Sequence, residues 1–111
     1  CVSSTENISN AILATGFPVS SDFSHKTLSK FVDDIKIYKK IRLLGSAALS
    51  LAYVSSGRVD IYQENDIKIW DVAAGIAIVR AAGGETQLIQ SKVKEIVTVR
   101  ATNSNLTQKI S

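Results

Sequence analysis

Three features near the middle of this sequence carry groups that could do chemistry. Asp71 opens a small-residue stretch of helical periodicity, and the helix dipole favours a carboxylate in the first turn of a helix. Glu64 offers a carboxylate that can accept two hydrogen bonds from hydroxyl groups. Gly45-Ser46-Ala47 opens another helical stretch, and the unpaired backbone N–H groups of a helix N-terminus can bind anionic or hydroxyl oxygens.

Each of these features also has a purely structural explanation. Asp71 could be an ordinary acidic residue at a helix N-terminus. Glu64 could be a solvated acid in a turn, since charged residues mostly lie on protein surfaces. The segment that begins at Gly45 could be a capped helix whose small residues allow tight packing. The residues taken singly leave both explanations open.

The order and spacing of four sequence blocks add a resemblance. The blocks are Gly45-Ser46-Ala47-Ala48-Leu49-Ser50-Leu51-Ala52-Tyr53, then Gly57-Arg58-Val59-Asp60 with Tyr62-Gln63-Glu64, then Trp70-Asp71-Val72-Ala73-Ala74-Gly75, and finally Ala82-Gly83-Gly84. In this order and with these gaps, they resemble the C-terminal half of the inositol monophosphatase family of metal-dependent phosphatases. Weaker similarity over residues 11–18 and 97–105 extends the resemblance to most of the chain.

The resemblance implies a fold, an activity and site residues. The implied fold is half of an α/β/α/β/α layered sandwich. The implied activity is that of a Mg²⁺-dependent phosphomonoesterase, which hydrolyses a sugar-alcohol or inositol phosphate through a metal-activated water. Asp71 matches the position of a metal ligand, and Glu64 matches the position that binds substrate hydroxyls. Gly45, Ser46 and Ala47 match the segment whose backbone N–H groups line the substrate pocket. The resemblance also allows a homodimer.

Part of the family pattern lies outside these residues. The family's Asp-Pro-hydrophobic-Asp-Gly-Thr motif and its upstream glutamate, which hold the metals and activate water, do not occur in this sequence. One carboxylate cannot build a two-metal site, so we assign no catalytic residue and expect the chain alone to be a poor catalyst. Its missing partner would be the N-terminal half of the same protein. Ser50, Ile69 and Ala81 also depart from the family pattern, which bears on the subfamily more than on the chemistry. The alternative is a non-catalytic binding or scaffold domain with the same fold.

The elements that must position these residues alternate along the chain, which is typical of layered α/β architecture. We expect strands at residues 11–15, 41–44, 58–63, 86–90 and 96–101, and helices at residues 28–38, 47–56, 70–82 and 103–111. In the second helix, Leu49, Ala52 and Tyr53 are predicted to share one face. The third helix should be mostly buried, with Trp70 packing so that it orients Asp71. A turn is predicted at residues 64–66. We therefore predict an α/β/α sandwich, with residues 1–111 forming a single domain.

Composition narrows the class of protein. The chain has 111 residues, is 45% hydrophobic and carries a net charge of +3, which indicates one globular domain or a piece of one. Its basic run Lys39-Lys40 with Arg42 is too sparse to favour nucleic-acid binding, although a basic nucleic-acid module remains an alternative. No apolar run has the length of a membrane span, so we expect no membrane partner.

The cysteine, methionine and histidine content adds three smaller expectations. A lone cysteine, Cys1, fits a reducing compartment and hence a cytoplasmic protein. The sequence contains no methionine, so we expect Cys1 to be a cut or processed end. His25 has no second histidine or cysteine nearby and is expected to be a surface residue and not a metal ligand.

Overall fold

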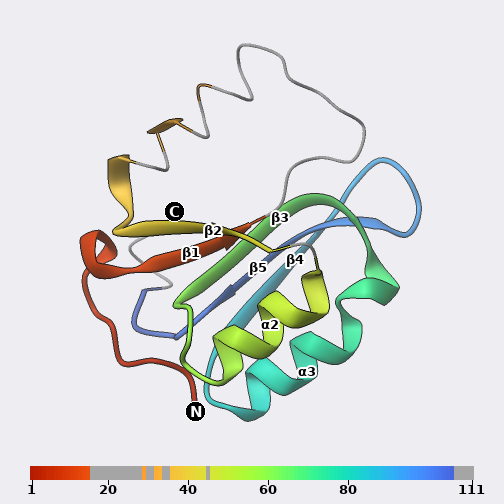
Figure 1. Ribbon diagram of the computed structural model, residues 1–111. Helices are drawn as coiled ribbons and strands as arrows, with labels where there is room; N and C mark the ends of the chain where they lie inside the picture. Colours follow the sequence, from red (N-terminus) through yellow and green to blue (C-terminus); the bar gives the residue numbers. More distant parts are fainter. Residues whose placement is uncertain (16–28, 30–31, 34–35, 45, 107–111) are drawn as a thin grey trace.

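A five-stranded mixed sheet organises the chain (Figure 1), and the computed structural model describes residues 1–15, 29, 32–33, 36–44 and 46–106. The strand order is β2-β1-β3-β5-β4. Strand β1 is parallel to both β2 and β3, whereas β5 is antiparallel to both β3 and β4. The strands are β1 (Ile12–Thr15), β2 (Lys40–Leu43), β3 (Ile61–Lys68), β4 (Glu85–Gln90) and β5 (Ile96–Thr102).

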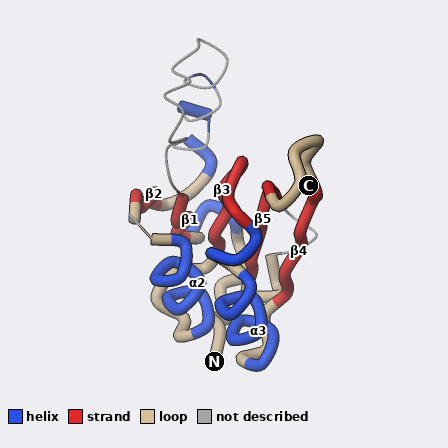
Figure 2. Tube along the Cα trace, turned by 90° about the vertical axis from the view of Figure 1, so that its right-hand side faces the viewer, coloured by secondary structure: helices blue, strands red, loops and turns tan. Residues whose placement is uncertain are grey.

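Two helices, α2 (Ala47–Ser55) and α3 (Ala73–Ala81), lie side by side on one face of this sheet (Figures 1 and 2). Short 3-10 turns, η1 (Ile8–Asn10) and η2 (Ile69–Asp71), precede β1 and α3. The predicted strands at residues 11–15, 41–44, 86–90 and 96–101 are confirmed as β1, β2, β4 and β5, and the α/β class is confirmed with them.

The main core fills the space between the sheet and the two helices. On β5, Val97, Val99 and Ala101 alternate toward the helices, as the period of a strand requires. The same cluster includes Tyr62 on β3, Ala14 on β1 and a set of apolar residues from the helical layer. That set is Leu51, Val54, Val72, Ile76 and Val79. A smaller cluster of Ala11, Leu13, Ile61 and Leu106 packs on the opposite face.

Helix α2 begins and ends where local chemistry allows. Ser46 caps it, because the Ser46 hydroxyl accepts a hydrogen bond from the Leu49 N–H at 3.2 Å. Gly57, with φ at +79°, lets the chain turn away after the helix. Leu51 and Val54 form the buried side of the helix, whereas Leu49 is 43% exposed. The helix is apolar on every side, so the pattern alone could not single out the buried face.

Strand β3 is longer than the sequence predicts. It runs for eight residues through Glu64-Asn65-Asp66, the segment predicted to be a turn. The strand pairs with β5 on both sides of an irregularity, and the register shifts between Glu64 and Ile67. A β-bulge of this kind lets turn-forming residues stay inside a strand whose partner continues. The turn prediction was therefore wrong.

The region around α3 also differs from the prediction. The helix begins at Ala73, so Trp70 and Asp71 lie in η2, ahead of it. Only Gly75, Ile76 and Val79 are buried within α3, and its other face is exposed in the described structure. Trp70 is 56% exposed, so it does not pack into the core formed by the described residues. The small residues of α3 suggested a buried helix, but a helix face is buried only where another part of the protein covers it.

Several predictions fall mostly outside the described residues. Of the helix expected at residues 28–38, the described positions 29, 32, 33, 36 and 37 are helical. His25 and most of the helix expected at residues 103–111 lie outside the described residues. None of the helices within the described ranges has the length and apolar character that crossing a membrane requires.

A buried polar network ties the two ends of the described chain to the sheet. The Asp60 carboxylate accepts hydrogen bonds from the Ile12 N–H at 2.7 Å and from the Ser3 hydroxyl. The Asn103 side-chain amide donates to the Ser3 hydroxyl at 2.9 Å and to the Thr5 carbonyl at 2.8 Å. Asp60 and Asn103 are both buried, and hydrogen bonds of this kind compensate the cost of burying them.

The helices α2 and α3 approach closely at Gly75. A Cβ atom at this position would lie 2.5 Å from Leu51 Cδ1 and 2.7 Å from Leu51 Cβ. The first of these atoms could swing away, but the second is fixed to the backbone of α2. Only glycine therefore permits the observed separation of the two helices.

We predict that Gly75→Ala destabilises the intact protein. Alanine gains about 1 kcal/mol of helix propensity, while overpacking a well-packed contact costs about 1–3 kcal/mol, so the steric cost should prevail. Urea unfolding measures the difference. Ala77→Gly is the matched control, because Ala77 lies on the exposed face of α3, and there glycine should be the less stable residue. If alanine is the more stable residue at both positions, the close approach is not a constraint.

Candidate functional site

The candidate site lies at one edge of the sheet. Strands β1, β2 and β3 are parallel, so their carboxyl ends meet at the same edge. Helix α2 follows β2 and helix α3 follows β3, so both helices begin at that edge (Figure 1). Ligands of open α/β sheets commonly bind outside the carboxyl ends of the strands.

The first part of the site is the N-terminus of α2. Ser46 is exposed, and its side chain is occupied in capping the Leu49 N–H. Ala47 is half-buried and packs against the main core, which anchors the first turn. The remaining backbone N–H groups of a first helical turn have no partner within their own helix and can bind oxygen atoms of a ligand. Gly45 lies outside the described residues.

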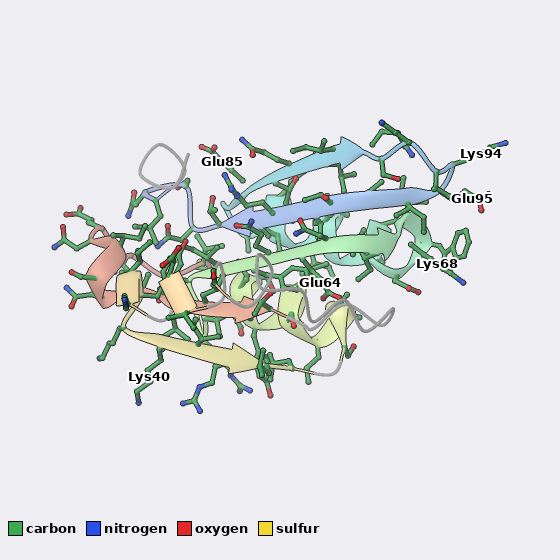
Figure 3. All side chains as sticks on the ribbon, turned by 90° about the horizontal axis from the view of Figure 1, so that it is seen from above. Lys40, Glu64, Lys68, Glu85, Lys94 and Glu95 are labelled. Atoms are coloured by element: carbon green, nitrogen blue, oxygen red, sulfur yellow. The ribbon has the colours of Figure 1, made fainter. Side chains whose placement is uncertain are left out.

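The second part is the Glu64 carboxylate on β3. Glu64 is half-buried, and its Oε1 accepts a hydrogen bond from the Tyr62 hydroxyl at 2.7 Å. Figure 3 shows Glu64 near the middle of the sheet, well apart from Lys40 on the outer strand β2. Lys40 therefore does not contribute to the surroundings of Glu64.

Tyr62 was not identified from the sequence as a site residue. Its side chain is completely buried in the main core, and its hydroxyl faces Glu64. Burial raises the pKa of Tyr62 above its ordinary value of 10.0, and the hydrogen bond and negative charge of Glu64 raise this pKa further. The negative charge of Asp71 acts on the pKa of Tyr62 in the same direction. The phenol thus stays protonated, and the charges of both predicted site carboxylates, Glu64 and Asp71, act on it.

A signal for Tyr62 was present in the sequence. Residues two apart on a strand share one face, so Tyr62 and Glu64 had to point to the same side of β3. The signal could be used only if Glu64 belonged to the strand, and the turn predicted at residues 64–66 excluded Glu64 from it.

The third part is Asp71, two residues before α3. It lies in η2 and is exposed, so its predicted position in the first turn of a buried helix was wrong. No described residue forms a hydrogen bond or ion pair with its carboxylate. Beside it, the Lys68 ammonium lies 5.4 Å from the centre of the Trp70 ring, a distance typical of a cation–π contact.

These residues can supply part of a metal site. Magnesium prefers hard oxygen ligands, often one or two carboxylates together with phosphate oxygens, and the Asp71 carboxylate fits one such position. Within the described ranges, no three His, Cys, Asp or Glu side chains are grouped so that they could hold a metal ion. A group of three such side chains that included Asp71 would therefore need at least one residue from outside the described ranges.

Comparison with known proteins gives one consistent family. The sequence model described as the inositol monophosphatase family matches residues 1–110. An inositol-1-monophosphatase of Caulobacter vibrioides is 31% identical over 109 residues, which cover 95% of this chain and 43% of that protein. A protein of Xylella fastidiosa named Nus factor SuhB is 47% identical over 85 residues, which cover 75% of this chain and 30% of that protein.

Solved structures agree with the sequence comparison. SuhB of Mycobacterium tuberculosis superposes with a TM-score of 0.85 at 29% identity, covering 98% of this chain and 42% of that one. The inositol monophosphatase of Anabaena superposes with a TM-score of 0.82 at 34% identity, covering 95% of this chain and 43% of that one. This chain therefore spans less than half the length of the relatives that it matches.

The raised pKa of Tyr62 predicts a change of stability with pH. In the unfolded chain the phenol ionises near pH 10, whereas in the folded protein it resists ionisation. The contribution of Tyr62 to stability is therefore complete below about pH 10 and is lost as the pH rises, by at most about 1.4 kcal/mol per pH unit. Unfolding free energies from pH 8 to 11 should fall more steeply for the intact wild-type protein than for Tyr62→Phe. Parallel curves would contradict the burial of an un-ionised phenol.

Proposed function

The chain belongs to the inositol monophosphatase family, and from this membership we propose that it is the C-terminal part of a magnesium-dependent phosphomonoesterase. The proposed reaction is hydrolysis of a sugar-alcohol or inositol phosphate by a metal-activated water. The family match across residues 1–110 is the observation that carries the proposal. The meeting of two helix N-termini and two acidic residues near one edge of the sheet supports it.

We assign Asp71 the role of one metal ligand. Its carboxylate is exposed and makes no bond to any described residue, so it is available to a cation. When bound, magnesium would shield the charge of the phosphoryl group and activate the attacking water. Helix α3 begins two residues after Asp71, and the positive end of a helix dipole favours a negatively charged group nearby.

We assign Glu64 and the start of α2 to the substrate. One oxygen of Glu64 already accepts the Tyr62 hydroxyl, which leaves Oε2 to accept hydroxyl groups of a polyol. The backbone N–H groups of Ser46 and Ala47 are suited to oxygen atoms of the same ligand, because they lie at a helix N-terminus, and we assign the N–H of Gly45 to the same role. Neither group would transfer a proton, and together they would hold the substrate beside Asp71.

The partner that completes the site is proposed to be the remainder of the same protein. The exposed face of α2, η2 and α3 carries large apolar side chains, and an apolar surface of this kind marks an interaction site. These side chains are Leu49, Ile69, Trp70 and Ile78. Because relatives are more than twice as long as this chain, their additional length is available to cover such a surface. A cytoplasmic location and a homodimer are further parts of the proposal.

A second candidate is a binding role without catalysis. It is favoured by the relative from Xylella fastidiosa, which is 47% identical and is named a Nus factor and not a phosphatase. The two candidates differ in whether the intact protein turns over phosphate esters. Release of inorganic phosphate from inositol 1-phosphate with added magnesium, abolished by a chelator, would decide for the enzyme.

We predict that residues 1–111 expressed alone do not hydrolyse phosphomonoesters and bind magnesium only weakly. A lone carboxylate cannot neutralise a dication and hold it octahedrally. Calorimetric titration with magnesium and a phosphate-release assay measure the two properties, and circular dichroism checks that the chain is folded. Co-expression of the remaining part of the protein should restore turnover. Chelator-sensitive hydrolysis by the isolated chain would show that the site has been assigned to the wrong residues.

We predict that Asp71→Asn in the intact protein lowers phosphatase activity by several orders of magnitude with little change in metal-free stability. Asparagine keeps the size of the side chain but removes the negative charge that the metal requires. Melting temperature without metal, magnesium affinity and turnover are measured in parallel. Asp33→Asn, an exposed change on another helix, should alter none of them. Loss of the fold with normal turnover of the surviving protein would make Asp71 a structural residue.

A further inference from the structure

The contact between Tyr62 and Glu64 crosses the boundary between the core and the candidate site. The Tyr62 side chain has no exposed surface, whereas Glu64 is only half-buried. The hydroxyl of the first donates to Oε1 of the second at 2.7 Å. The Tyr62 phenol, which is fixed in the core, thus contacts the Glu64 carboxylate, which belongs to the proposed substrate site.

Glu64 lies at the last regular pair before an interruption in β3, opposite Val99 on β5. Regular pairing of β3 with β5 is interrupted between Glu64 and Ile67. A glutamate side chain also rotates about several bonds and loses this freedom only when a contact fixes it. By contrast, the Tyr62 ring packs in the main core among residues such as Leu51 and Val99, so its hydroxyl can point in only one direction.

The charges around the phenol keep it a hydrogen-bond donor. Burial is the largest cause of the raised pKa of Tyr62, followed by the hydrogen bond to Glu64. The negative charges of Glu64 and then Asp71 raise this pKa further. An ionised phenolate would repel the Glu64 carboxylate, whereas the neutral hydroxyl donates to it. The donor therefore persists across the pH range in which a phosphatase would be assayed.

We propose that Tyr62 is a positioning residue, whose hydroxyl occupies one oxygen of Glu64 and aims the other at adjacent hydroxyl groups of a polyol phosphate. The inference rests on the proposed function, since it concerns the substrate of that same site. Tyr62 itself does not touch the substrate. It determines how strongly the protein prefers a phosphate ester that carries neighbouring hydroxyls over one that carries none.

The test compares two substrates in the intact protein with saturating magnesium. Tyr62→Phe should raise KM for inositol 1-phosphate roughly tenfold, the equivalent of one lost hydrogen bond to a charged group, with little change in kcat. KM for phenyl phosphate, which has no hydroxyl groups on its leaving group, should stay the same. A purely structural role for Tyr62 would affect both substrates alike.

Three further variants make the result specific. Tyr62→Phe combined with Glu64→Gln should discriminate no worse than Glu64→Gln alone, because Tyr62 acts through Glu64. Replacing Tyr62 by 4-aminophenylalanine, which restores a donor at the end of the ring, should recover most of the preference. Tyr53→Phe removes a phenol hydroxyl near the opposite end of α2 and should leave both KM values unchanged.

The outcomes separate this inference from the function on which it rests. If the wild-type protein hydrolyses both substrates and Tyr62→Phe keeps the full preference for inositol 1-phosphate, the positioning role is wrong and the proposed function stands. Failure of 4-aminophenylalanine to recover the preference, in a variant that melts like the wild type, would likewise overturn the positioning role. If the wild-type protein hydrolyses neither substrate, both proposals fall together.

Discussion

The absence of a side chain at Gly75 sets the distance between α2 and α3, and much of the candidate site depends on that distance. Each helix follows a parallel strand, so each begins at the same edge of the sheet. Ser46 stands at the beginning of one helix and Asp71 just ahead of the other. A wider separation at the Leu51 contact would move these two groups apart and would also loosen the packing around Tyr62.

The described residues carry more of the proposed substrate contacts than of the proposed metal site. In that proposal, Glu64 and the first turn of α2 would bind hydroxyl and phosphate oxygens of the substrate. Asp71 would bind the cation together with further ligands, and no group of three His, Cys, Asp or Glu side chains within the described ranges could supply them. Because a metal needs several ligands from different segments, its site can be divided between two halves of a protein. Binding and catalysis would then both require that the two halves be assembled correctly.

Local chemistry made part of this fold predictable. The strand predicted at residues 96–101 forms β5, and the serine and glycine at the two ends of α2 marked the limits of that helix. The extension of β3 could not be predicted, because the bulge after Glu64 is stabilised by pairing with β5, more than 30 residues away in the sequence. The exposure of Trp70 was unpredictable for a related reason, since burial depends on which other surface covers a side chain. The contact of Tyr62 with Glu64 follows from the alternation of side chains along β3. It was missed because the predicted strand ended at residue 63, before Glu64.

The polar network around Asp60 has a consequence for the order of folding. Its hydrogen bonds from Asn103 to Ser3 and Thr5 join residues 100 and 98 positions apart, whereas the contacts of α2 with α3 are far more local. Closing a long loop costs more entropy than closing a short one, so local contacts tend to form first. The helical pair and β3 can therefore assemble before residues 3–5 and 103 are brought together. The hydrogen bonds between these segments would form late, and a chain growing from the ribosome could complete them only after residue 103 had emerged.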